Sequence, residues 1–392
     1  MRSRDVKRLL LSVPAPDEAA ARRRAWAVVK AAYESREPVR WHRRHLRPLA
    51  VLALAFALLA AIVTPPGRAV LNSIRDAIGR ERTAGVKPAQ RALFRLPAGG
   101  RVLVDSPGGA WIVHRDGSRR RLGNYSMAAW SAYGRYVGAV RGGELFAVDV
   151  RGNIRWTKAR KQPVAFPRWS YEGYRIAYLS GRTIRIIVGN GTDDRSLGGA
   201  DPRVAPAWRY GTHEVAYVGP DGSVRIADAD LRRTLARAAA PPGGVRQLAW
   251  SADGSRLLAV GRRGVRVLSP RGRQLGAASA PGQTVAAAFA PSGHRFAVVV
   301  RRGRSAVVVA NADGLRGRLP RQPAFSGLGR FDAVAWSPNG RWLLVSWPNA
   351  DQWVFVRLGR RPKLQAVSNV SRQFDPGATT ARPARMDGWC CP

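Results

Sequence analysis

A unit of roughly 40 residues recurs along most of this chain and restricts the folds that it can adopt. Each copy has an apolar tripeptide ending in an aromatic residue, then a turn, an arginine and an apolar strand. Examples are LAWSADGSRLLAV around Trp250 and VAWSPNGRWLLVS around Trp336. Two further strands, separated by a Gly, Asp or Asn turn, follow in segments such as VRVLSPRGRQL at 265–275. Four short strands per repeat predict one blade of a β-propeller.

The copies can be aligned on one apolar anchor residue each, at spacings of 34, 39, 39, 42, 39 and 47 residues. These anchors are Leu96, Trp130, Trp169, Trp208, Trp250, Phe289 and Trp336. The first copy, FRLPAGGRVLVDS, is degenerate and has leucine in place of the aromatic residue. A four-stranded sheet cannot bury both of its faces alone, so we expect the anchors to fill the wedges between stacked blades. We predict an all-β propeller of about seven four-stranded blades over 91–370, with six or eight blades as alternatives.

An arginine ends many of the turns, and it has two interpretations. We expect Arg101, Arg135, Arg175 and Arg341 to donate hydrogen bonds to the neighbouring turn or strand. The alternative is a ring of guanidinium groups that binds anions.

The W-S-x-x-G-R units resemble the WD40-like repeat of TolB-type propellers, which is usually written W-S-P-D-G-x. Residues 336–340 and 250–254 match it best, whereas Leu96, Phe289 and the turn at 210–213 depart from it. The chain as a whole, from a basic leader to a C-terminal GWCC, resembles an uncharacterised family of membrane proteins from high-GC bacteria. The resemblance implies the fold and no particular activity, because propellers serve as enzymes, scaffolds and sensors.

An uncharged run of twenty residues, 48–67, precedes the repeats. This is about the length that crosses a bilayer as a helix, and four arginines and two histidines lie directly before it. The positive-inside rule then places the N-terminus in the cytoplasm and the repeats outside. A cleaved signal peptide is the alternative, but its charged leader normally has only a few residues. We predict a single-pass protein of the cytoplasmic membrane with an extracytoplasmic propeller.

The basic leader, 1–47, contains a predicted helix with Trp26, Val29 and Tyr33 on one apolar face. This face is suited to a cytoplasmic partner or an anionic lipid surface, and a solvated helix is the alternative. Residues 68–90 are interpreted as a stalk and linker.

The C-terminal tail, 371–392, ends in Gly-Trp-Cys-Cys-Pro. In an oxidising compartment Cys390 and Cys391 can form a vicinal disulfide or pair with another chain, and two free thiols are the alternative. We expect the tail to fold back on the propeller with Trp389 buried, so that it closes the ring or covers one mouth of the channel.

Catalytic motifs are absent from the sequence. The five histidines show no metal-ligand spacing, and there is no G-x-S-x-G elbow, phosphate loop or dinucleotide fingerprint. We therefore predict no catalytic residue, no metal and no cofactor. Glu144, Asp149, Glu172 and Asp230 are scattered, and only a meeting at the central channel would make them a carboxylate pair.

The formal charge of +41, from 66 Lys and Arg against 25 Asp and Glu, favours anionic partners. The extracytoplasmic placement and the use of the aromatic residues in the repeat argue against nucleic acid. We predict a non-catalytic, membrane-tethered binding or scaffold module for envelope components or partner proteins. One alternative is a signal transducer with the domain order of transmembrane anti-sigma proteins. The other is a hydrolase or lyase that acts at the channel mouth.

Overall fold

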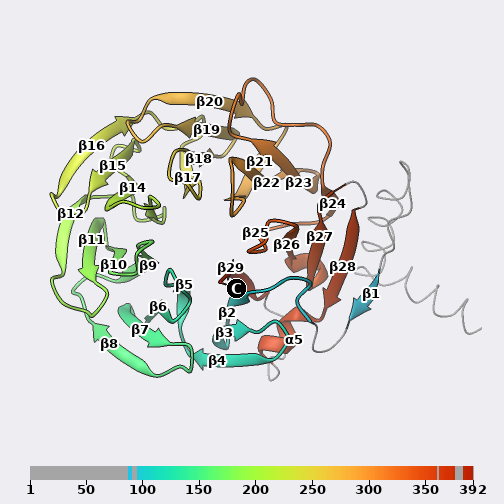
Figure 1. Cartoon of the computed structure of the whole chain (residues 1–392), viewed down its shortest axis with the longest axis horizontal. Coiled ribbons are helices and arrows are strands. Elements are labelled where there is room, and N and C mark those ends of the chain that lie inside the picture. The colour runs from blue at the N-terminus through green and yellow to red at the C-terminus, as the bar shows by residue number, and fades with distance from the viewer. Residues whose placement is uncertain (1–86, 91–94, 360–361, 376–382, 392) are drawn as a thin grey trace, which may run out of the picture. The chain divides into compact units, whose positions relative to one another are not determined.

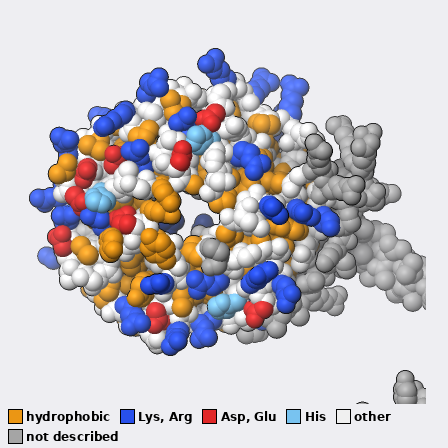
Figure 2. Space-filling view, viewed as in Figure 1, with side chains coloured by type: hydrophobic (Ala, Val, Ile, Leu, Met, Phe, Trp, Pro, Cys, Tyr) orange, Lys and Arg blue, Asp and Glu red, His pale blue; other side chains and the backbone are white. Residues whose placement is uncertain are grey.

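The structure is a computed structural model that describes residues 87–90, 95–359, 362–375 and 383–391. Within these residues the strands form seven sheets, which stand around a common axis like the blades of a propeller (Figure 1). The space-filling view in Figure 2 shows that the ring is hollowed at its centre. The predicted all-β propeller is therefore confirmed, with seven as the number of blades.

Each blade is an antiparallel meander that runs from the axis to the rim (Figure 1). The strands of blades 2 to 4 are β5 (Ser126–Trp130), β6 (Tyr136–Arg141), β7 (Glu144–Asp149) and β8 (Ile154–Lys158); β9 (Val164–Trp169), β10 (Arg175–Ser180), β11 (Thr183–Val188) and β12 (Arg195–Gly199); and β13 (Ala207–Trp208), β14 (Glu214–Val218), β15 (Val224–Asp228) and β16 (Arg233–Ala238).

Blades 5 to 7 repeat this plan. Their strands are β17 (Val245–Trp250), β18 (Leu257–Gly261), β19 (Gly264–Leu268) and β20 (Gln274–Ser279); β21 (Gln283–Phe289), β22 (Arg295–Arg302), β23 (Arg304–Asn311) and β24 (Phe325–Leu328); and β25 (Ala333–Trp336), β26 (Trp342–Trp347), β27 (Gln352–Arg357) and β28 (Lys363–Ser368). A fifth strand, β1 (Lys87–Gln90), runs parallel to β28 at the rim of blade 7. Short helices η1 (Pro348–Ala350) and α5 (Val370–Phe374) lie before β27 and after β28.

Blade 1 combines two distant parts of the sequence. Its three outer strands are β2 (Arg101–Ser106), β3 (Gly109–Val113) and β4 (Arg119–Gly123), and its innermost strand is β29 (Arg385–Cys390). The tail strand β29 pairs antiparallel with β2, so that Trp389 lies opposite Val102. Hydrogen bonds and packing thus close the ring, which is the first of the two roles that we expected for the tail.

This closure changes the anchor of the first repeat. In the other six blades the anchor is the last residue of the innermost strand, as Trp208 is in β13 and Trp250 is in β17. In blade 1 the innermost strand comes from the tail, so Trp389 takes this place near the end of β29. Leu96, the predicted anchor, instead lies before β2, where it is buried in the same cluster as Trp389.

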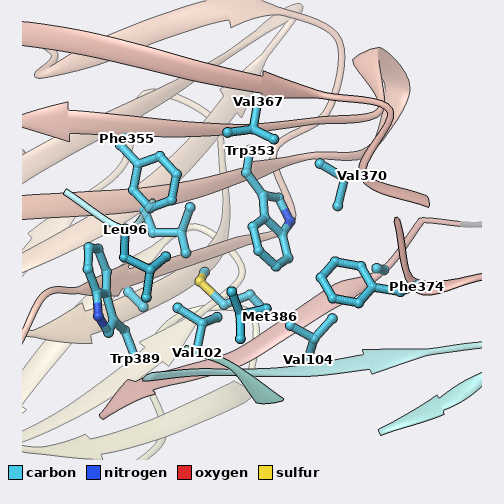
Figure 3. Packing of buried hydrophobic residues seen from close by; sticks show 14 of the residues in the cluster. Leu96, Val102, Val104, Trp353, Phe355, Val367, Val370, Phe374, Met386 and Trp389 are labelled. Carbon is cyan, nitrogen blue, oxygen red and sulfur yellow. The ribbon is translucent and has the colours of Figure 1, made fainter. Parts of the chain in front are cut away.

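Among the described residues the hydrophobic core consists of seven clusters, one at each boundary between neighbouring blades. Successive residues of a strand point to opposite faces of a sheet, so each strand serves two boundaries. In β27, Phe355 packs toward blade 1, whereas Val354 and Val356 pack toward blade 6. Figure 3 shows the boundary between blades 7 and 1, where Trp389 lies near Phe355 with ring centroids 5.7 Å apart.

The segments predicted before the propeller lie outside the described residues, apart from 87–90. They are the leader 1–47 with the face of Trp26, Val29 and Tyr33, the membrane segment 48–67 and the stalk. The predicted linker extended to Gln90, but its last four residues form β1. In the described parts of the chain, no helix has the length and apolar character that crossing a bilayer requires.

Candidate functional site

One face of the ring, which we call the turn face, carries the turns that join the first strand of each blade to the second. In blades 2 to 4 this face exposes five tyrosine side chains, which we call the tyrosine patch. Its members are Tyr133, Tyr136, Tyr171, Tyr174 and Tyr210. The side chains of Tyr133 and Tyr174 are 66% and 70% exposed. Aromatic side chains are enriched at protein interfaces, so the tyrosine patch has the composition of a contact surface.

A pocket of about 320 Å³ opens beside the tyrosine patch, between the innermost strands of blades 3, 4 and 5. The anchors Trp169, Trp208 and Trp250 line it, together with Tyr171 and Tyr210, whose ring centroids lie 3.4 Å apart. Burial, together with a hydrogen bond to the hydroxyl group of Tyr210, raises the pKa of Tyr171 to about 12. We call this cavity the aromatic pocket.

The three tryptophans of the aromatic pocket also belong to the core. Each tryptophan packs at the boundary between its own blade and the preceding one, as the repeat predicts. Trp169 lies between blades 2 and 3, Trp208 between blades 3 and 4, and Trp250 between blades 4 and 5. Backbone carbonyls hold two of the rings in place: Trp208 Nε1 donates to the oxygen of Arg168 at 2.8 Å, and Trp250 Nε1 donates to that of Ala207 at 3.2 Å. The core packing therefore fixes the rings that line the pocket.

On the turn face, arginine side chains donate hydrogen bonds to the neighbouring blade. Arg101 Nη2 donates to the backbone oxygen of Gly134 in blade 2 at 2.7 Å. Arg175 of blade 3 donates two hydrogen bonds of 2.9 Å to the carboxylate of Asp230 in blade 4. Both arginines therefore bind a neighbouring turn, as predicted. The alternative of an anion-binding ring does not fit Arg175, because Asp230 already compensates its charge.

His294 joins blades 5 and 6 by a group that has the connectivity of a Ser-His-Asp triad. Its Nδ1 lies 2.6 Å from Asp313 Oδ2, and its Nε2 lies 3.0 Å from Ser255 Oγ. However, Nε2 lies closer, at 2.8 Å, to Asp253 Oδ2, which also accepts the hydroxyl hydrogen bond of Ser255. Hydrogen bonds to these two carboxylates raise the pKa of His294. The hydroxyl proton of Ser255 is donated to Asp253 and not to the ring, so we interpret the group as a polar contact between blades.

Charged side chains from several blades gather at the central channel. Asp387 and Arg385 lie on β29, Arg168 lies on β9, and Asp332 directly precedes β25. The side chain of Asp387 is exposed at the surface, but the surrounding protein still desolvates its carboxyl group. This desolvation, reinforced by the charge of Asp105 and opposed by those of Arg168 and Arg385, raises the pKa of Asp387 to about 7.

Burial has the same effect on the two other channel acids, because it raises the pKa values of Asp105 and Asp332. Asp105 Oδ2 accepts a hydrogen bond of 2.6 Å from the backbone nitrogen of Met127. Asp332 Oδ1 is buried without a hydrogen-bond partner among the described residues. In the same part of the chain, no group of three His, Cys, Asp or Glu side chains could hold a metal ion.

The acids that the sequence analysis considered do not meet at the channel. Asp149 accepts hydrogen bonds from the backbone of its own turn, and Glu144 lies opposite Arg141 in a hairpin. Glu172 and Asp230 both bind Arg175 on the turn face.

Sequence reasoning missed the channel acids because they lie outside the repeat motif. One signal could have revealed Asp387, because it lies two residues before Trp389. Had the tail been identified as an innermost strand, Asp387 would have been placed at the channel.

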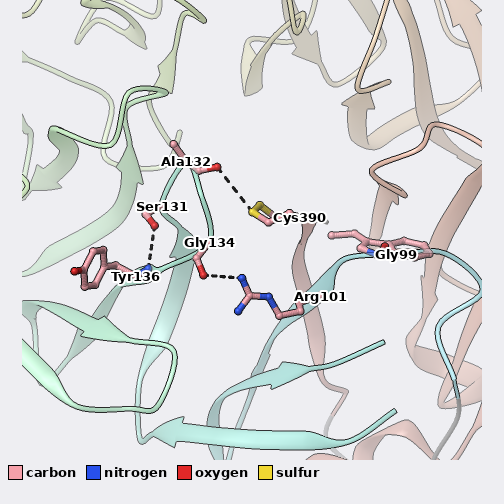
Figure 4. Close-up of a disulfide and its surroundings, with 9 residues drawn as sticks. Gly99, Arg101, Ser131, Ala132, Gly134, Tyr136 and Cys390 are labelled. Carbon is pink, nitrogen blue, oxygen red and sulfur yellow. Dashed lines mark hydrogen bonds between the residues drawn. A yellow bond between two sulfur atoms is a disulfide. The ribbon is translucent and has the colours of Figure 1, made fainter. Parts of the chain in front are cut away.

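Cys390 and Cys391 form a vicinal disulfide at the end of β29, one of the states that the sequence left open. Cys391 Sγ lies 3.8 Å from the backbone oxygen of Ala132 in blade 2. Figure 4 shows the disulfide beside Ala132. The disulfide thus lies on the turn face, next to a second and larger pocket of about 900 Å³.

No known protein family matches the chain, and no curated protein matches it. Solved structures do. A chain of the mitotic checkpoint complex has 14% sequence identity and a TM-score of 0.52, over 77% of this chain and 88% of that chain. Kluyveromyces lactis Hsv2 has 13% identity and a TM-score of 0.51, over 68% and 93% of the two chains. U3-55K has 15% identity and a TM-score of 0.51, over 62% and 80%. At these identities the likeness shows the propeller fold.

Proposed function

We propose that this chain is a non-catalytic binding or scaffold module that holds a partner protein on the tyrosine patch. The observation that carries the proposal is the exposure of five tyrosines over three adjacent blades, next to a pocket whose walls the core makes rigid. Tyrosine contributes large contact area at low cost in conformational entropy, and tyrosine and arginine are common at the energetic centres of interfaces. One similar propeller belongs to the mitotic checkpoint complex, which supports a protein as the partner.

The proposal includes tethering to the cytoplasmic membrane by 48–67, with the propeller outside. The uncharged run and the basic residues before it support this placement. The vicinal disulfide supports it too, because disulfides persist in oxidising compartments. Alkaline phosphatase fused after residue 392 should then be active in intact bacteria, and an inactive fusion would contradict the placement.

The binding test compares two pairs of exposed side chains in the full-length chain. Tyr133→Ala with Tyr174→Ala removes the two most exposed members of the tyrosine patch. Ile154→Ala with Leu231→Ala removes apolar side chains that are 47% and 67% exposed outside it. Cross-linked partner protein is measured by quantitative mass spectrometry. We expect its amount to be at least fivefold lower than for the wild type in the tyrosine variant only. Equal recovery from both variants would refute the tyrosine patch as the binding surface.

A third variant, which lacks residues 1–47, distinguishes this function from signal transduction. Loss of the partner on deletion of the leader, with no effect of the tyrosine substitutions, would favour a transducer whose cytoplasmic segment binds the partner. An anionic envelope polymer recovered in place of a protein would identify the other predicted ligand class.

Catalysis at the channel is the second candidate, and Asp387 is the observation that favours it. A carboxyl group with a pKa near 7, beside Arg168 and two further acids, can donate or accept a proton at neutral pH. A screen of chromogenic glycosides and esters tests this candidate. Turnover that Asp387→Asn abolishes would support a hydrolase or lyase, and turnover unchanged by the substitution would refute this role of Asp387.

A further inference from the structure

Two segments of blade 1 that lie far apart in the sequence meet at the larger pocket of the turn face. One is Leu-Pro-Ala-Gly-Gly-Arg at 96–101, and the other is Gly-Trp-Cys-Cys at 388–391. Trp389 Nε1 donates a hydrogen bond of 3.0 Å to the backbone oxygen of Gly99, and Arg101 lies opposite Cys390 in the ladder between β2 and β29. Figure 4 shows Gly99, Arg101 and Cys390 around this point. Segments almost 300 residues apart thus form one wall of this pocket. We call the pocket the closure pocket.

The two glycines bring the backbone to the surface of the closure pocket. Gly100 has a φ of +96°, and a Cβ atom there would lie 2.8 Å from the backbone oxygen of Cys390. A Cβ atom at Gly99 would have no neighbour within 4 Å, so this residue faces open space. Gly99 therefore leaves room for a ligand to approach the main chain, whereas Gly100 permits the close approach of the tail strand.

The remaining lining is strongly basic. Arg95 and Arg115 are exposed at its edge, and Arg101 and His114 are half-buried deeper within it. Arg101 is fixed by its hydrogen bond to Gly134 and lies 5.0 Å above the ring of Trp130. The one acid of the lining, Asp116, accepts two hydrogen bonds from Ser118, at 2.9 Å from its nitrogen and 2.7 Å from its hydroxyl group. Its carboxylate is therefore turned to its own loop.

At His114 the charges of the neighbouring guanidinium groups outweigh that of the carboxylate. Desolvation and the neighbouring charges of Arg101 and Arg120 lower the pKa of this histidine, although Asp116 opposes them. Two nearby guanidinium groups therefore have a larger effect on the ring than the carboxylate. A site of this kind favours a ligand that brings negative charge.

We propose that the closure pocket binds a polyanionic ligand larger than free phosphate, through phosphate or carboxylate groups of that ligand. Guanidinium groups present paired N–H donors that match both kinds of oxyanion. The volume of about 900 Å³ leaves space for the rest of such a ligand. The inference does not depend on the tyrosine patch, because the lining residues of the two sites differ.

Calorimetric titration of the full-length chain with tripolyphosphate, and separately with citrate, at about 0.15 M NaCl tests the proposal. Arg95→Ala with Arg115→Ala removes two charges from the closure pocket. Arg271→Ala with Arg316→Ala removes two charges from exposed arginines in turns of blades 5 and 6. We expect at least about tenfold weaker binding in the first variant and less than about twofold in the second. The probe that binds more tightly identifies the oxyanion.

Equal weakening in both variants would show attraction by net charge alone and would overturn the proposal. Absence of binding by both probes to the wild type would overturn it too. The exposed positions of all four arginines leave the fold intact, which an unchanged melting temperature would verify. Tyr133→Ala with Tyr174→Ala should leave the affinity for the oxyanion unchanged. Failure of the closure pocket and failure of the tyrosine patch are thereby distinguished.

Discussion

The boundary between blades 7 and 1 and the boundary between blades 5 and 6 join similar sheets by different means. At the first, large aromatic side chains meet: Trp389 packs against Phe355, and Phe374 packs against Trp353 at a centroid distance of 5.4 Å. At the second, the core consists mainly of valine, alanine and leucine, and the polar group around His294 joins the turns.

The difference follows from how the chain connects the blades. A short linker after β20 carries the chain directly from blade 5 to blade 6, so these blades are neighbours by sequence. Blade 1 is completed by a strand from far along the chain, and the entropy of closing that loop opposes the contact. Burial of large aromatic side chains offsets this cost, because hydrophobic stabilisation grows with the apolar area removed from water. The comparison teaches that equivalent blade boundaries can be stabilised by different side chains, large aromatic ones at the closing boundary and smaller aliphatic ones between blades 5 and 6.

The largest effect is expected from Trp389→Ala, which removes the aromatic residue of the closing strand. Trp389 is 7% exposed, so we expect a loss of about 3–5 kcal/mol in the free energy of unfolding, measured by urea denaturation. The matched control is Phe289→Ala, which removes the partly buried anchor at the boundary between blades 5 and 6. We expect it to cost about 2 kcal/mol, because less apolar area is lost. An equal or greater cost for Phe289→Ala would contradict the comparison.

An intermediate effect is expected from Asp387→Asn on the same closing strand. The pKa of about 7 lies above the value of about 3.9 for an unfolded chain, so the folded state binds more protons between these values. The stability of the wild type should therefore fall as pH rises from about 4 to 7. The asparagine variant should be more stable than the wild type at pH 8 and should lose this slope. Parallel pH profiles of the two proteins, from urea midpoints, would disprove the assignment.

The smallest effect is expected from His294→Asn at the boundary between blades 5 and 6. Its pKa is raised, so its contribution is complete below about pH 6.5 and is lost as pH rises through the folded value. Hydrogen bonds lower the pKa values of Asp253 and Asp313, which keeps both ionised at pH 5. We expect a loss of about 0.5–1 kcal/mol at pH 5–6 and almost none at pH 9, from urea midpoints.

The matched control for this histidine is His213→Asn, which removes a contact of 2.6 Å to Asp230 alone. Asp230 keeps Arg175 and Arg195 as partners, so the substitution should cost less than His294→Asn at pH 5–6. A greater cost would show that a second carboxylate adds nothing to the contact at His294.

The fold was predictable because the repeat is local: an anchor, a turn and an arginine recur within each blade. The tail shows where this reasoning ends. Leu96 takes the aromatic position when FRLPAGGRVLVDS is aligned with the other copies, but the strand order that gives this place to Trp389 depends on pairing between distant segments. No periodicity within 385–390 could reveal its partner strand.

The binding surfaces were less predictable for a related reason. Tyr133, Tyr174 and Tyr210 occupy different repeats, and only the ring brings them to one face. Asp387 and Asp332 come close to each other only through closure. Desolvation there raises both pKa values, and no local sequence pattern records that desolvation.

The position of β29 as an innermost strand has a consequence for the synthesis of the protein. While the ribosome is still making the chain, blade 1 has only three strands, and the inner edge of β2 presents unpaired backbone groups that can recruit other chains. Six blades can assemble from consecutive segments as they emerge, but the seventh must wait until residue 390 is free. A product that stops before 385 lacks the innermost strand of blade 1 and therefore keeps an open ring.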